Sequence, residues 1–117
     1  MRSPPAEPQR LVRRARAELG SVVAVADLLG VSRPTVAEWL SGVGAPSAAQ
    51  QRVLRDLATV FERLGALPRG RTPAGWFRLP CLALDGATPE DVLVVDGARR
   101  VLDAIERELA PDGPGYR

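Results

Sequence analysis

The sequence contains no histidine, no lysine and a single cysteine, Cys81. Structural zinc sites need several Cys and His ligands, so this composition excludes them, and we expect neither a metal nor another cofactor. One cysteine cannot form an internal disulfide, and without a histidine it has no base for nucleophilic catalysis. A buried structural thiol is therefore predicted. No apolar stretch is long enough to cross a membrane.

Catalytic motifs are equally scarce. The chain has no Gly-rich phosphate-binding loop of the nucleotide-binding kinds. Glu90 and Asp91 are adjacent carboxylates, but they follow Thr88-Pro89, so we expect them in the first turn of a helix, where they offset exposed amide dipoles. The 117 residues suffice for one domain or two small helical modules, not for a large catalytic architecture. We therefore expect no enzyme and no catalytic residues.

The segment 22–41, VVAVADLLGVSRPTVAEWLS, has the residue pattern of a helix-turn-helix. Ala26 is small where two helices cross, and Gly30 can take the left-handed conformation of a tight turn. Ser32 is a preferred helix cap, and Pro34 falls in the first turn of the second helix, where a missing amide hydrogen costs least. An ordinary helical hairpin with a glycine turn is the alternative interpretation.

The second helix of this pair is predicted to be a DNA-recognition helix. The spacing of apolar residues predicts which side chains pack the two helices together: Val25, Leu29, Val31, Val36 and Trp39. The residues expected at the DNA are Ser32, Arg33, Thr35, Ala37, Glu38 and Ser41. Arg33 suits either a guanine edge or a phosphate, and Glu38 suits a cytosine amino group or an arginine of its own chain. The small net charge implies weak binding by one copy, so we expect a dimer on repeated half-sites.

Charge is distributed unevenly along the chain. Residues 1–71 hold 11 Arg and 6 acids, net +5, whereas residues 72–117 hold 5 Arg and 8 acids, net −3. A basic half suits the phosphate backbone of double-stranded DNA, and an acidic half suits a protein partner. The first helix is expected from about Pro8 to Leu19. Its basic face either follows a phosphate strand or is simply solvated; it comprises Arg10, Arg13, Arg14 and Arg16.

Further helices follow from capping and spacing. Ser47 and Gln50 have the spacing of a capping box ahead of a long amphipathic helix that ends at Gly65. Thr72-Pro73 begins another helix, and its aromatic residues are expected in a core or an interface. Thr88-Pro89 begins the next, although VLVV at 92–95 is β-branched enough for a strand. Asp96 is predicted to cap the final helix.

These segments predict an all-α fold with an N-terminal helix-turn-helix module and a small helical C-terminal module. The first eight residues, MRSPPAEP, have no apolar signal region, so we expect a loose tail and a cytoplasmic protein. The expected organisation is a flexible tail at 1–8, a DNA-binding and dimerisation module at 9–65, a linker at 66–72, a C-terminal module at 73–110 and a flexible tail at 111–117.

Five segments follow one another in the order LLGVSRPTVAEWLSG, APSAAQQRVLRDLATVFERL, AGWFRLPCLALDG, TPEDVL and DGARRVLDAIER. This order resembles the Xre/MbcA/ParS-type antitoxins, and the resemblance covers about Leu11 to Leu109. The second half is the more diagnostic, with a Trp-started helix, a Leu-x-Gly step, a Thr-Pro helix start and a Gly-x-x-x-Val-Leu helix at Gly97–Leu102. Glu90-Asp91 depart from the pattern, because an apolar residue often follows this proline.

The resemblance implies an antitoxin of a type II toxin–antitoxin system, paired with a RES-domain toxin that degrades NAD. It implies that the N-terminal module binds operator DNA, regulates its own operon and forms a homodimer within a larger complex. The C-terminal module would cover the NAD pocket of the toxin, and we expect its contacts at Trp76, Arg78, Arg99 and Arg100. The alternative is a stand-alone helix-turn-helix repressor whose C-terminal module serves only dimerisation.

Overall fold

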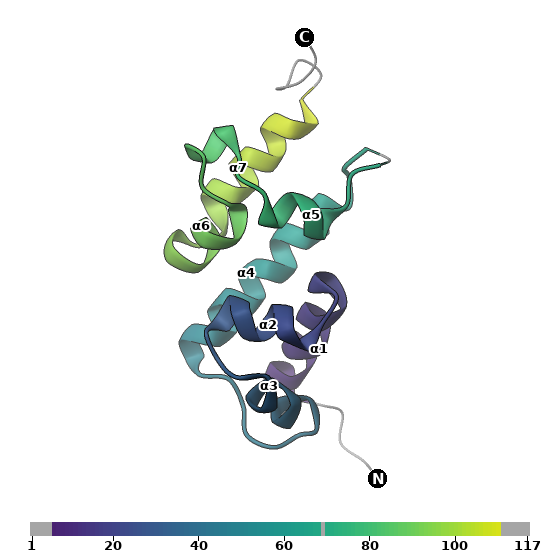
Figure 1. The fold of residues 1–117 in the computed structure, drawn as a ribbon, viewed down its shortest axis with the longest axis vertical. Coiled ribbons are helices and arrows are strands. Elements are labelled where there is room, and N and C mark those ends of the chain that lie inside the picture. Colours follow the sequence, from purple (N-terminus) through teal and green to yellow (C-terminus); the bar gives the residue numbers. More distant parts are fainter. Residues whose placement is uncertain (1–5, 69, 111–117) are drawn as a thin grey trace. The chain divides into compact units, whose positions relative to one another are not determined.

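The computed structural model describes residues 6–68 and 70–110, and in this part of the chain the fold is entirely helical (Figure 1). The all-α prediction is confirmed. The elements are α1 (Glu7–Leu19), α2 (Val22–Leu29), α3 (Arg33–Leu40), α4 (Ala48–Leu64), α5 (Pro73–Arg78), the 3-10 helix η1 (Leu82–Leu84), α6 (Pro89–Asp96) and α7 (Ala98–Leu109).

The chain forms two compact units, residues 1–58 and residues 59–117. The division falls inside α4, upstream of the linker expected at 66–72. The reason is that the C-terminal part of α4 supplies the buried residues Val60, Phe61 and Leu64 to the second unit. With this division the first unit holds 8 Arg and 5 acids, and the second 8 Arg and 9 acids. The contrast in net charge shrinks to +3 against −1.

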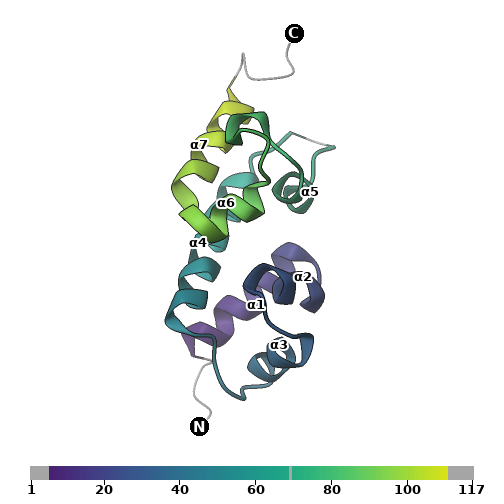
Figure 2. The same ribbon diagram turned by 60° about the vertical axis from the view of Figure 1, so that its left-hand side comes forward.

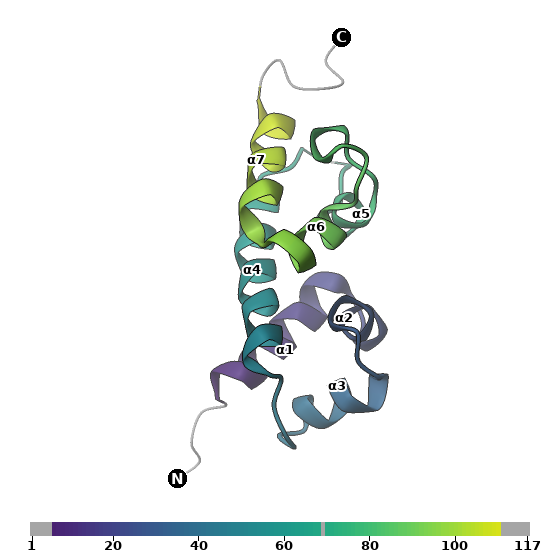
Figure 3. The ribbon, with the colours of Figure 1, turned by 90° about the vertical axis from the view of Figure 1, so that its left-hand side faces the viewer.

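In the first unit, α1, α2 and α3 pack against one another (Figure 3). The core consists of Val12, Ala15, Leu19, Ala24, Val25, Ala26, Leu28, Val36, Trp39, Val53, Leu54 and Leu57. Helix α1 begins at Glu7, with Pro8 in its first turn, so the tail expected at 1–8 ends earlier than predicted. Proline is well placed there because its missing amide hydrogen would have no partner. Residues 1–5 of that tail lie outside the described residues.

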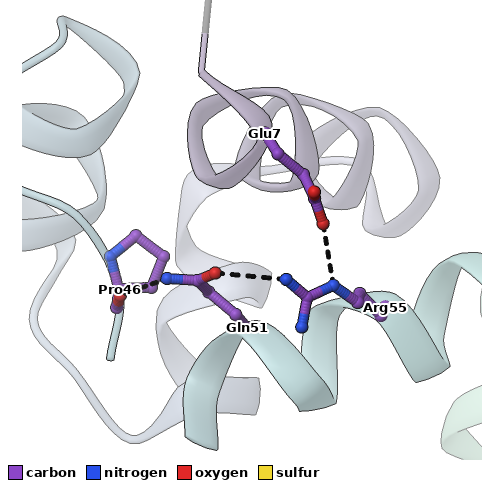
Figure 4. Close-up of polar contacts among 4 residues, drawn as sticks. All are labelled: Glu7, Pro46, Gln51 and Arg55. Carbon is purple, nitrogen blue, oxygen red and sulfur yellow. Dashed lines mark hydrogen bonds and ion pairs between the residues drawn. The ribbon is translucent and has the colours of Figure 1, made fainter. Parts of the chain in front are cut away.

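Polar contacts attach the start of α4 to the rest of the first unit (Figure 4). Arg55 Nε donates to Glu7 Oε1 at 2.8 Å, and Gln51 Nε2 donates to the carbonyl oxygen of Pro46 at 2.9 Å. The predicted capping box is confirmed: Ser47 N donates to Gln50 Oε1 at 2.8 Å, and Gln50 N donates to Ser47 Oγ at 3.1 Å. These bonds fix where α4 begins.

In the second unit, α6 packs against both α5 and α7, and η1 packs against α7 (Figure 2). Phe61 and Phe77 meet edge to face, with ring centroids 5.3 Å apart and planes at 64°, a favourable arrangement for aromatic rings. Arg63 donates two hydrogen bonds to the Glu106 carboxylate, at 2.6 and 2.9 Å. The C-terminal tail predicted at 111–117 lies outside the described residues.

The junction of α6 and α7 corrects one prediction and settles another. The VLVV segment is helical, and Glu90 and Asp91 lie in the first turn of α6 as expected. The prediction that Asp96 caps α7 is wrong, because Asp96 is the last residue of α6 and Gly97 is the N-cap. Gly97 joins the two helices alone, at φ 88° and ψ −168°, a conformation accessible essentially only to glycine.

Candidate DNA-binding and partner-binding surfaces

The turn between α2 and α3 has the geometry that its sequence predicts. Gly30 is left-handed at φ 69°, and its amide donates to the carbonyl oxygen of Ala26. Ser32 Oγ accepts from the amide of Thr35 at 3.3 Å, and proline occupies the first turn of α3. Trp39 is only 7% exposed, as predicted. Helix α2, however, buries Leu28, which the spacing did not assign to the packing, and leaves Leu29 half-buried. Val31, also predicted to pack, is half-buried.

Three of the six predicted DNA contacts, Arg33, Ala37 and Glu38, are exposed on α3. Ser32 and Ser41 are exposed at its N-cap and C-cap, and Thr35 is half-buried. The hydroxyls are engaged locally. Ser32 Oγ and Thr35 Oγ1 are 2.8 Å apart, and Ser41 Oγ donates to the carbonyl oxygen of Glu38 at 2.8 Å. The charged groups on this face are therefore Arg33 and Glu38. Within the described residues, no ion pair joins Glu38 to an arginine of its own chain.

Helix α1 starts beside the end of α3, because Gln9 Nε2 donates to the carbonyl oxygen of Leu40 at 3.1 Å. Arg10, Arg13 and Arg16 are exposed on α1. The fourth predicted phosphate-facing residue is instead directed towards its own chain. Arg14 donates to Glu18 Oε2 at 3.1 Å and to the carbonyl oxygen of Ala58 at 3.3 Å.

Glu18 occupies an unfavourable environment for a charged group. Its Oε1 atom is buried without a hydrogen-bond partner in the structure. Burial raises the pKa of the Glu18 carboxyl above its ordinary value, although the hydrogen bond from Arg14 and the charge of Arg14 act in the opposite direction. This carboxyl destabilises the first unit when it is ionised.

A hollow of about 210 Å³ opens on the second unit, between the end of α5, the segment through η1, and α7. The buried Trp76 and Ala104 line it, and the exposed Leu79 and Leu82 flank it. Its remaining lining residues are Arg71, Pro80, Cys81, Ala83, Arg107 and Glu108. Cys81 is buried, as its sequence context predicts.

The four residues predicted to contact a toxin do not form one cluster. Trp76 lines the hollow. Arg100 lines a smaller neighbouring depression and donates to Asp96 at 2.9 Å. Arg78 and Arg99 are exposed but line neither depression.

Sequence reasoning missed three exposed residues beside this hollow, Leu79, Leu82 and Arg107. The apolar residues of LPCLALDG were the available signal.

In residues 6–68 and 70–110, no group of three or more His, Cys, Asp or Glu is placed to hold a metal ion. No helix of these residues has both the length and the apolar character required to span a membrane.

The structure is that of a small all-α protein with two helical units in one chain. The first unit contains a pair of helices joined by a turn at Gly30. Comparison with solved structures identifies a more specific likeness. The chain is similar to a chain of the MbcT-MbcA toxin-antitoxin complex of M. tuberculosis, with 27% sequence identity and a TM-score of 0.69. The match covers 88% of this chain and 94% of that chain. No protein-family model and no curated protein sequence matches.

This structural match confirms the resemblance to MbcA-type antitoxins that the sequence predicts. The unmatched 12% of the chain is smaller than either compact unit, so the likeness extends over both. It therefore includes the second unit, whose sequence motifs are the more diagnostic.

Proposed function

We propose that this protein is the antitoxin of a toxin–antitoxin pair and that it acts by binding, without catalysis of its own. The observation that carries the proposal is the structural match, which spans both units and belongs to a toxin-antitoxin complex. A repressor that shared only a DNA-binding unit would match over one half. We therefore propose that the second unit binds the toxin.

We further propose that the first unit binds operator DNA and represses its own operon. Helix α3 enters the major groove, with Arg33 at its exposed N-terminus directed to a guanine edge. The face carries one arginine and one glutamate, so it contributes specificity more than net attraction. Attraction to phosphates comes from the exposed arginines of α1 and from dimerisation, which doubles their number.

The proposed toxin is a RES-domain protein that degrades NAD in the cytoplasm. Its NAD site must hold a pyrophosphate and is expected to be basic, so acidic groups on the second unit would complement it. The net charge of the second unit, −1, agrees with this expectation. Trp76, Arg78, Arg99 and Arg100 remain the residues proposed to contact the toxin, the first of them through the hollow that it lines.

Co-expression of the full chain with the product of the adjacent gene tests the proposal. We expect the two proteins to co-purify and the complex to consume NAD more slowly than the isolated toxin. A toxin-binding fragment should begin at Thr59, because Phe61 and Leu64 belong to the core of the second unit. The Arg33→Ala chain serves as the control that keeps toxin binding. Failure of the full chain to co-purify would contradict the antitoxin function.

A further inference from the structure

We propose that the hollow between α5, η1 and α7 is where the toxin docks, receiving an apolar side chain of the toxin beside a toxin carboxylate that pairs with Arg107. This inference rests on the proposed antitoxin function and names the surface that performs it. Three observations carry it: exposed apolar residues at the rim, the rigidity of the segment that presents them, and the charge of the rim.

The rim of the hollow exposes large apolar side chains to water. Leu82 is 87% exposed and Leu79 is 62% exposed, yet both lie beside a concave surface lined by Trp76 and Ala104. Exposed leucines clustered around a concave surface are typical of an interaction site, whereas singly scattered ones are not. A side chain that enters the hollow would meet a lining that includes both leucines.

Backbone hydrogen bonds hold the segment that carries Leu82. Cys81 N donates to the carbonyl oxygen of Ala87 at 3.0 Å, and the carbonyl oxygen of Cys81 accepts from Leu84 N at 3.0 Å and from Gly86 N at 2.9 Å. The Cys81 side chain is buried and anchors the same turn. Leu82 is therefore presented on a fixed loop, which lowers the entropy lost on binding.

The charge of the rim selects the chemistry of the occupant. On one side Arg71 is already neutralised by Glu108, at 2.9 Å. Arg107 lines both this hollow and the neighbouring depression, and it has no ion pair within the described residues. An apolar group with a carboxylate beside it matches both features of the rim.

The same charge argues against a second copy of this chain as the occupant. A two-fold contact centred on the hollow brings the same patch of both copies together, so that the two Arg107 side chains face each other. Like charges in contact oppose association. A toxin surface with a carboxylate has no such conflict.

Affinity of the full-length chain for the purified product of the adjacent gene tests the proposal. Leu82→Asp places a carboxylate at the apolar rim, and we expect binding to weaken roughly thirtyfold or more, as for a central interface residue. Val95→Asp is the matched control, because Val95 is 78% exposed in the same unit but does not line the hollow. Arg107→Ala should weaken binding about tenfold.

The possible outcomes separate the two claims. If the wild-type chain does not bind the adjacent gene product, the proposed function fails. If the wild-type chain binds and Leu82→Asp binds equally well, or if Val95→Asp is the damaging change, the docking site is misassigned. If Leu82→Asp melts at the same temperature as the wild type, its weaker binding does not come from misfolding. Weaker binding by Arg107→Ala supports the same site independently, and wild-type binding by Arg107→Ala contradicts it. A loss of self-association in Leu82→Asp, measured by light scattering, would overturn the proposal in favour of a second copy.

Discussion

Replacing Trp39 by alanine should remove much of the stability of the first unit. The Trp39 side chain is 7% exposed, and a large aromatic side chain buries about 150–250 Å². At about 25 cal/mol per Å² this burial contributes roughly 4–6 kcal/mol, an upper bound because unfolded chains are partly compact. Large-to-small changes at such sites cost about 3–5 kcal/mol. A unit of this size has a total stability of only about 3–9 kcal/mol.

Urea denaturation followed by circular dichroism at 222 nm measures this loss. We expect part of the helical signal of Trp39→Ala to disappear at low urea. The fluorescence of Trp76, which lies in the second unit, follows the unfolding of that unit separately. Val43→Ala is the control, because Val43 lies in the same unit and is 56% exposed. It should change the free energy of unfolding by less than about 0.5 kcal/mol. A denaturation curve of Trp39→Ala that overlays the wild type would refute the assignment of Trp39 to the core.

Three further predictions concern DNA and pH. Arg33→Ala should cost about 1–3 kcal/mol of operator binding in mobility-shift assays and relax the preference at one base pair, but leave toxin binding intact. The prediction is contradicted if Arg33→Ala binds the operator and a scrambled duplex as the wild type does. Hydrogen bonds from Arg63 lower the pKa of Glu106, so its stabilising effect is present above the ordinary value of 4.5 and lost as pH falls below it. Melting temperatures of wild type and Glu106→Gln should therefore converge in acid, and a constant difference would count against the ion pair. Burial raises the pKa of Glu18, so the first unit loses stability as pH rises past 4.5 and through the raised pKa. Glu18→Gln should make the melting temperature less dependent on pH in this range. The same pH dependence in Glu18→Gln and wild type would contradict a raised pKa of Glu18.

Local rules predicted the helix boundaries well wherever a side chain enforces them. Ser32, Ser47, Thr72 and Thr88 each accept a hydrogen bond from an amide three residues later, because their hydroxyls satisfy donors that the helix leaves free. The same reasoning failed at Asp96, where the backbone turn at Gly97 ends one helix and begins the next without a side-chain cap. A one-residue junction has no distinctive sequence signal beyond the glycine itself.

Periodicity failed where nearly every residue is apolar. Helix α2 reads VVAVADLL, with Asp27 as its single polar residue, so apolar periodicity does not decide between Leu28 and Leu29 for the core. The boundary of the units was misplaced for a different reason. A loop is visible in the sequence at 66–72, but the sharing of one long helix between two cores depends on tertiary packing.

The candidate sites were predictable to different extents. The exposed face of α3 follows from helical spacing alone. The hollow on the second unit does not, because it forms only when η1 packs against α7 and brings Leu82 near Arg107. These two residues are 25 positions apart in the sequence and belong to different elements.

Growth of cells that express the adjacent gene is the most direct test of the antitoxin function. Induction of that gene alone should arrest growth, and co-expression of the full-length chain should restore it, whereas Leu82→Asp should restore it poorly. The antitoxin function is contradicted if the adjacent gene arrests growth and the wild-type chain gives no protection.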